Sequence, residues 1–339
     1  MEDTLKLKGV EPNQDQRKKN KLKRVIRTSA IGWAFVLPAV ILMLIFTIYP
    51  IFNSLICAFK QDYRLISNSF NGWGFENFRK VISNEAASGS AAQFGTCLIN
   101  TLIFAFISVP VSTLLALLIA VGLNSIKYVQ KLYQTVLFLP YLTNAMAMGA
   151  VFATFFNVVG TPSNTETVGL FNNFLGWFGI PAQNWINGSQ LGQAFDPAKG
   201  RFVVIVYEVW SGLPFKILIL FSAIQNVGKQ HYDAARIDGA SKSTILWKIT
   251  VPLISPMLSY LLITGIMGGL KAYTAIVGLF GQDMGPGGDF SMGTMVGYIY
   301  QSIYENNIGY AAAGSLILFA IIMVITAINL YVSKKRVHY

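Results

Sequence analysis

The sequence predicts an all-α integral membrane protein with six transmembrane helices. The 339 residues have a mean hydropathy of +0.51, and only 12% of them are charged. Charged residues are absent from five long stretches, namely 28–59, 86–126, 132–165, 249–270 and 306–333. Each stretch holds the ~20 apolar residues with which an α-helix crosses a bilayer. Their hydrophobicity is continuous rather than alternating, which favours helices over a membrane β-barrel.

The predicted spans and their orientation follow from these stretches and from the basic residues between them. If the N-terminus is cytosolic, 18 of the 26 Lys and Arg residues fall in cytosolic segments and six fall outside; Lys216 and Lys271 lie within spans. Basic residues concentrate on the cytosolic side of membrane proteins, so both termini are predicted to be cytoplasmic. The six spans are predicted at 31–52, 98–123, 134–158, 202–225, 252–280 and 310–332.

The charge distribution also sets the expected domain organisation. Residues 1–28 are expected to form a basic cytoplasmic tail. This tail can lie against anionic membrane lipid, but plain anchoring of the orientation is the interpretation that we favour. Because topology accounts for the net charge of +11, nucleic acid is not expected as a partner. The first span is too long to be the apolar core of a signal peptide. Together with the outside loop that follows it, this span makes up residues 29–97. The remaining five spans make up a core over 98–333, and 334–339 is a short cytoplasmic tail.

The two cysteines, Cys57 and Cys97, both fall near the predicted outer face. A disulfide between them is one interpretation. Unpaired buried thiols are the interpretation that we favour.

The loop 226–250 is the only sizeable cytosolic loop between predicted spans, and it carries a recognisable pattern. Asp233–Ile237 predicts a short helix with an acidic start, which the helix dipole favours, and Gly239 provides its C-terminal stop. Pro252 and Pro256 permit a break where the chain re-enters the membrane. Small side chains in the loop let another protein approach the backbone at Ala234, Ala235 and Ala240. A docking helix and an ordinary interfacial connector both fit this pattern.

The order Asp233-Ala-Ala-x-x-Asp-Gly-Ala, followed by Ile249 and Pro252, resembles the coupling-loop motif of bacterial ABC-importer permeases. That motif reads Glu-Ala-Ala, three residues, Gly, and a distal Ile and Pro. Further segments are similar to the binding-protein-dependent sugar permeases of the maltose and glycerol-phosphate type over residues 30–335: Leu37-Pro38-Ala39, Tyr49-Pro50, Gly74–Phe78, Asn100–Leu102, Leu139-Pro140, Val209-Trp210, Gly297–Tyr300 and Gly309–Ala313. Two departures are Asp233 in place of Glu, and Gly285-Pro286-Gly287-Gly288 where the family has Gly-Gly-Pro.

The resemblance implies a permease subunit of an ATP-driven importer in a bacterial cell membrane, with a carbohydrate, foremost an oligosaccharide, as its cargo. Its partners would be a second homologous permease subunit, cytosolic ATP-binding subunits and an extracytoplasmic substrate-binding protein. A coupling helix between helices four and five would contact the ATPase through Asp233, Ala234, Ala235, Asp238, Gly239 and Ala240. The chain has no Walker A pattern, so ATP and Mg²⁺ are expected on the partner. No catalytic residue, metal ligand or cofactor is expected in this chain.

Ionisable residues inside a membrane are candidates for function because they are costly in hydrocarbon. The three are Glu208, Lys216 and Lys271, of which Lys216 is expected to snorkel toward the cytosolic interface. The resemblance places the substrate path at Glu208, Gly212, Phe215, Thr264, Gly268 and Lys271. A structural ion pair between Glu208 and Lys271 is the alternative.

Two other functions remain open at this point. The same architecture could import a glycerol phosphate-type or uronic substrate, for which Lys271 is suited and Glu208 is not. An ion-coupled secondary transporter would use Glu208 as its proton or cation site. The coupling-loop motif and the six predicted spans argue against this second function.

Overall fold

The computed structural model describes residues 32–63, 68–84, 93–126, 130–161 and 164–336. The described residues divide into two units, 32–56 and 57–336. The described part of the first unit belongs to one helix that begins at Gly32, passes through a π-helical turn, η1 (Leu44–Ile48), and continues as α2 (Tyr49–Phe59). None of its most apolar stretch is buried within the chain, as expected for a helix surrounded by lipid.

Four helices are long and apolar enough to cross a membrane: Gly32–Phe59, Phe94–Ser125, Pro197–Asn226 and Ile308–Ser333. Two further helix pairs pass the same test but are sharply bent, so the described residues hold between four and six spans. The second span consists of α4 (Phe94–Ile103), the π-helical turn η3 (Phe104–Ser108) and α5 (Val109–Ser125); the fourth is α9 (Pro197–Asn226) and the sixth lies in α16 (Ile308–Arg336). These three contain the predicted spans 98–123, 202–225 and 310–332.

The predicted third span, 134–158, is broken rather than straight. Helix α6 (Gln130–Phe138) runs into the 3-10 turn η4 (Leu139–Leu142), and α7 (Ala145–Phe156) then leaves at 106°. Pro140 cannot donate the backbone hydrogen bond that would continue the helix. Asn144 starts the next one, because its side chain accepts hydrogen bonds from the amides of Met146 (2.9 Å) and Ala147 (3.3 Å).

The predicted break near Pro252 and Pro256 is confirmed. The chain passes through α11 (Lys242–Ile245), the π-helical turn η5 (Leu246–Thr250) and α12 (Val251–Leu253), and then bends by 70° into α13 (Ser255–Gly269). The predicted fifth span, 252–280, is wrong in extent, because its apolar helix ends at Gly269. Tight turns follow, with the amide of Lys271 bonded to the carbonyl of Gly268 (2.9 Å), and α14 (Thr274–Phe280) is a separate helix.

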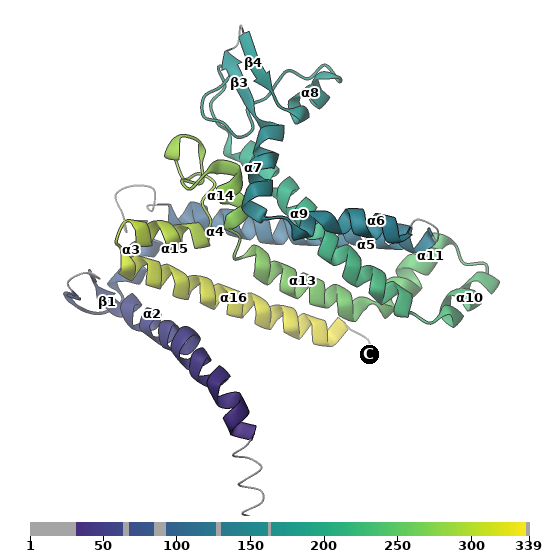
Figure 1. The fold of residues 1–339 in the computed structure, drawn as a ribbon, viewed down its shortest axis with the longest axis horizontal. Helices are drawn as coiled ribbons and strands as arrows, with labels where there is room; N and C mark the ends of the chain where they lie inside the picture. Colours follow the sequence, from purple (N-terminus) through teal and green to yellow (C-terminus); the bar gives the residue numbers. More distant parts are fainter. Residues whose placement is uncertain (1–31, 64–67, 85–92, 127–129, 162–163, 337–339) are drawn as a thin grey trace, which may run out of the picture. The chain divides into compact units, whose positions relative to one another are not determined.

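Helix α14 packs against α7, and two glycines allow the close approach (Figure 1). A Cβ on Gly149 would lie 2.8 Å from the carbonyl oxygen of Ala275 and 2.9 Å from Cα of Gly278. A Cβ on Gly278 would overlap the carbonyl oxygen of Met146. Small residues at such crossings let helix backbones touch, which is the usual basis of helix packing in membranes.

The remaining elements connect the long helices. Strands β1 (Lys60–Gln61) and β2 (Gly72–Trp73) form a short antiparallel hairpin, followed by α3 (Glu76–Ile82). Beyond α7, β3 (Val158–Thr161) and β4 (Asn164–Val168) form a second antiparallel hairpin with a bulge at Val159/Gly160, followed by α8 (Leu170–Gly176). The 3-10 turn η6 (Pro286–Gly288) and α15 (Met295–Tyr304) precede α16.

The core of the second unit is built around α4, α9, α14 and α15. Its largest fully buried side chains include Tyr207 of α9 and Tyr298 of α15. Cys57 and Cys97 are both buried and free, which confirms the expectation of unpaired thiols and excludes the disulfide.

Candidate functional site

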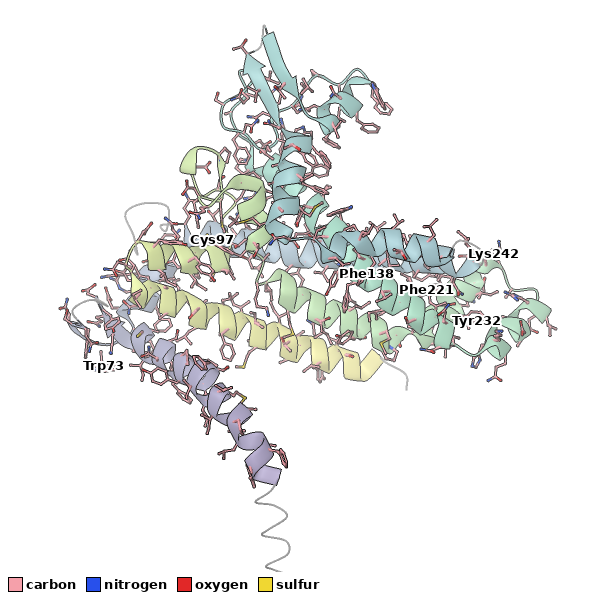
Figure 2. The ribbon with its side chains drawn as sticks, viewed as in Figure 1. Trp73, Cys97, Phe138, Phe221, Tyr232 and Lys242 are labelled. Atoms are coloured by element: carbon pink, nitrogen blue, oxygen red, sulfur yellow. The ribbon has the colours of Figure 1, made fainter. Side chains whose placement is uncertain are left out.

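The predicted coupling loop carries α10 (Lys229–Ile237), which follows directly after the end of α9. Figure 1 shows α10 and α11 together at one end of the long helices, and Figure 2 places Tyr232 and Lys242 there. The predicted helix over Asp233–Ile237 begins four residues earlier than expected. Asp233 therefore lies in its middle, and the predicted acidic first turn is wrong. The Asp233 carboxylate instead lies 3.5 Å from the guanidinium of Arg236, one turn further along.

The end of α10 is the predicted glycine stop. Gly239 has a φ of +71°, a left-handed conformation that glycine adopts without a steric penalty. The amide of Gly239 bonds to the carbonyl of Arg236 (3.1 Å), and that of Ala240 bonds to the carbonyl of Ala235 (2.9 Å). This pair of bonds is a Schellman motif, which satisfies carbonyls that the helix end would otherwise leave unpaired.

One side of α10 is attached to its own chain and the other is uncovered. Ala235 is buried, and the hydroxyl of Thr250 in η5 approaches that of Tyr232 at 3.4 Å. Ala234 and Asp238 are exposed, and Ile237 is 86% exposed. A short, capped helix with small side chains and one bulky apolar side chain turned outward has the form expected of a segment that enters a groove in another protein.

A pocket of about 340 Å³ lies where the end of α9, the start of α10 and the bend before α13 meet. Asn226 and His231 line it from α9 and α10, and Ile254 lines it from the bend. Helix α10 is therefore next to the joint between α12 and α13. A displacement of α10 would act directly on that joint.

The second predicted site contains Glu208, which lies on α9 next to the break between η4 and α7. Its side chain lines a pocket of about 280 Å³ formed by α9, η4, α7 and the start of α14. The hydroxyl of Tyr207 donates to the carbonyl of Ala145 (2.8 Å) and ties α9 to the start of α7. The lining residues are Pro140, Tyr141, Thr143, Ala145, Met148, Tyr207, Glu208, Trp210, Ser211 and Ala275.

Within the described part of the chain, the Glu208 carboxylate accepts no hydrogen bond and forms no salt bridge, although the Lys216 ammonium two turns further along α9 attracts it electrostatically. The alternative ion pair between Glu208 and Lys271 does not form there, and Lys271 is exposed beyond the end of α13. A carboxylate inside a membrane domain that accepts no hydrogen bond is available to a ligand that brings its own donors.

The other predicted path residues do not all lie at the Glu208 pocket. Phe215 stacks on Tyr141, with ring centroids 5.7 Å apart and planes 17° apart, and so supports the wall of the Glu208 pocket. Gly212 faces away from that pocket, since a Cβ there would lie 3.7 Å from Ser112 Oγ and 3.8 Å from Lys216 Nζ. The remaining three residues do not line the pocket. They form one exposed face at the end of α13 and just beyond it, made of Thr264, Gly268 and Lys271.

Lys216 does not snorkel, contrary to expectation. It is only 7% exposed, and its ammonium donates to the carbonyl of Val109 (3.2 Å) and to the hydroxyl of Ser112, both on α5. The buried lysine thus joins α5 to α9.

Several residues of the Glu208 pocket are absent from the predicted set. Tyr141 and Thr143 come from the break after α6, and Met148 and Ala275 come from the α7–α14 pair. The available signal was Leu139-Pro140, because a proline within an apolar stretch marks a place where a span can break and line a cavity. Tyr207, Trp210 and Ser211 are neighbours of Glu208 in sequence.

Comparison with known families identifies the class of protein. The model of the binding-protein-dependent transport system inner membrane component matches residues 91–338. The chain therefore belongs to this family, which confirms the resemblance found in the sequence.

Individual relatives match over nearly their whole length. The arabinooligosaccharides transport system permease protein AraP of Bacillus subtilis is 30% identical over 308 residues, which cover 90% of this chain and 88% of the relative. The trehalose/maltose transport system permease protein MalF of Thermococcus litoralis is 26% identical and covers 95% and 99%. The lactose transport system permease protein LacF of Rhizobium radiobacter is 26% identical and covers 90% and 94%.

Solved structures share the fold. A bacterial ABC transporter involved in import of the acidic polysaccharide alginate matches with a TM-score of 0.73 at 22% identity, covering 93% of this chain and 99% of that one. The alginate transporter in complex with its alginate pentasaccharide-bound periplasmic protein matches with a TM-score of 0.72 and the same identity.

Proposed function

We propose that the chain is the permease subunit of an ATP-driven importer for a neutral oligosaccharide. The family assignment supports the permease function, and the names of AraP, MalF and LacF support a sugar. The observation that carries the finer proposal is the Glu208 pocket, where a carboxylate that accepts no hydrogen bond from a described residue lies among aromatic and hydroxyl side chains. Carboxylates accept hydrogen bonds from sugar hydroxyls, and aromatic faces pack against sugar rings.

The charge of this pocket favours a neutral cargo. Glu208 is its one carboxylate, and no Lys or Arg is among its lining residues. An anionic glycerol phosphate or uronic group would meet the negative charge of Glu208 there, because the Lys216 ammonium that partly offsets this charge is outside the pocket and bonded to α5. The lysine that was expected to suit an anion, Lys271, belongs to the separate face of α13.

The coupling loop supports the ATP-driven mechanism over an ion-coupled one. The uncovered face of α10, with Ala234 and Ile237 exposed, would sit in a groove of a cytosolic ATPase that carries ATP and Mg²⁺. Closure of two ATPase subunits would move α10 and, through its joint with α12 and α13, change access to the path between this chain and a second permease. A substrate-binding protein would deliver the sugar from outside, with both termini of this chain in the cytosol.

The proposal is tested by reconstituting the complete importer in liposomes and measuring ATP-dependent uptake of arabinotriose, maltotriose and a uronic trisaccharide. Glu208→Gln should lower kcat/KM for the transported neutral sugar about tenfold or more, because a hydrogen bond to a charged group contributes about 1.5–3 kcal/mol. Glu76→Gln, which changes a half-buried carboxylate on α3 that pairs with Arg79 away from the Glu208 pocket, is the control.

Normal uptake by Glu208→Gln would remove this residue from the path. Preferred uptake of the uronic sugar by the unmodified importer would contradict a neutral cargo. Uptake that persists without ATP but follows a proton or sodium gradient would favour the ion-coupled alternative.

A further inference from the structure

A second polar pocket, outside the Glu208 site, has no role in the function proposed above. It encloses about 460 Å³ where the β1–β2 hairpin and α3 meet the turn between α15 and α16. Both sides belong to segments that the charge distribution places outside the membrane. Nine of its ten lining residues have polar side chains and the tenth is Gly309, so the pocket is not an apolar lipid groove.

One buried acceptor in this pocket lacks a donor. Oε1 of Glu305 accepts from Gln301 (3.2 Å), whereas Oε2 is buried without a partner among the described residues. Asn77 also lines the pocket and is only 2% exposed, and its amide nitrogen donates to the carbonyls of Ala58 and Lys60, both at 2.9 Å. A buried acceptor is normally satisfied, so Oε2 of Glu305 calls for a ligand with a hydrogen-bond donor.

Donors are available in the same pocket. The side chains of Asn306, Asn307 and Tyr310 line it and bond to no other described side chain or carbonyl. A ligand here must therefore both donate and accept. A bare cation would leave the amide and phenol donors unused and would fill little of the volume. An anion would be repelled by Glu305, since no Lys or Arg lines the pocket and Lys80, which lies 3.8 Å from Asp62, is already paired with that carboxylate.

The chain reversal between α15 and α16 shapes one side of the pocket. Asn306 adopts a left-handed conformation with a φ of 61°, which turns the chain immediately before Asn307. A Cβ on Gly309 would lie 2.7 Å from Nδ2 of Asn77, so glycine leaves room for the buried amide.

We propose that this pocket binds a sugar residue through its hydroxyl groups, as an outer carbohydrate site separate from the Glu208 pocket. Hydroxyls donate and accept at once, which suits the mixture of Asn77, Glu305 and Tyr310. The volume lies within the range of small-molecule pockets. The nature of the ligand rests on the proposed function, because an importer of neutral oligosaccharides meets its cargo first on this side.

The test measures binding of arabinotriose and maltotriose at millimolar concentration to the full chain in lipid nanodiscs, by saturation-transfer difference NMR. Glu305→Ala and Asn307→Ala should each weaken binding about tenfold, which corresponds to about 1.4 kcal/mol. Asn307 is half-buried and its side chain bonds to no described residue, so its variant keeps the test valid should Glu305→Ala fold poorly. Asp283→Ala, which changes an exposed carboxylate between α14 and η6 that does not line the pocket, should bind as the unmodified chain does.

The Glu208→Gln variant distinguishes this outer site from the Glu208 pocket. Binding that survives in Glu208→Gln and is lost in Asn307→Ala would establish the outer site. Equal binding by the unmodified chain and Asn307→Ala would overturn it, and so would the complete loss of binding in Glu208→Gln. If neither sugar binds outside the path while ATP-dependent uptake is intact, the outer site is wrong and the proposed function stands. Ca²⁺ binding that depends on Glu305, with sugar binding unchanged, would also overturn it.

Discussion

Substitution of Gly239 is expected to loosen the coupling segment without displacing any neighbour. Its φ of +71° is unfavourable for any residue with a Cβ, and no atom lies within 4 Å of where that Cβ would be. The cost of Gly239→Ala is therefore conformational, about 1–2 kcal/mol. A change of that size shifts the equilibrium between the formed and frayed helix end by a factor of about 5–30.

The assay combines two measurements on the reconstituted importer. Hydrogen exchange at the amide of Ala240, which bonds to the carbonyl of Ala235, should be faster by that factor in Gly239→Ala. The number of sugars transported per ATP hydrolysed should fall, because a frayed α10 transmits less of the ATPase movement. Gly239→Asn is the matched control, since asparagine tolerates the left-handed conformation better than alanine does. Unchanged exchange and an unchanged ratio in the alanine variant would refute the assignment of α10 as a rigid coupling helix.

Three further substitutions test the packing behind the sites, each by thermal denaturation in detergent. Gly278→Leu should destabilise the protein by about 1–3 kcal/mol or prevent its folding, because a side chain there overlaps the backbone of α7; Gly268→Leu, where nothing lies within 4 Å, should be well tolerated. Lys216→Met should change stability by less than about 1 kcal/mol, since removal of a buried charge offsets the lost bonds to α5, and a large loss would contradict this. Asn100→Ala should cost about 1–3 kcal/mol or more, because it leaves the Gly293 carbonyl and the Arg201 guanidinium without their partner, and wild-type stability would argue against this role.

The parts of the fold that could be predicted are those set by local sequence. Spans two, four and six follow from charge-free apolar stretches, because the bilayer imposes the length of such helices. The break near Ile254 follows from Pro252 and Pro256, and the end of α10 follows from Gly239.

The remaining features depend on contacts between distant residues. Lys216 looked like a snorkelling residue because its partners, Val109 and Ser112, lie more than a hundred positions away. The separation of α14 from α13 could not be predicted, since both are apolar and the crossing of Gly149 with Gly278 is tertiary. For the same reason, the resemblance grouped Gly212 with Glu208 on the substrate path, although Gly212 faces α5 in the structure.

The most direct test of the central claim is a pull-down of the tagged chain in mild detergent, with loop 231–240 either intact or replaced by a Gly/Ser linker. The intact chain should recover a second permease and an ATPase, and the linker variant should retain the second permease but lose the ATPase. A chain that purifies alone and transports sugar in liposomes without ATP would contradict the account, and Glu208 would then be the ion site of a secondary transporter.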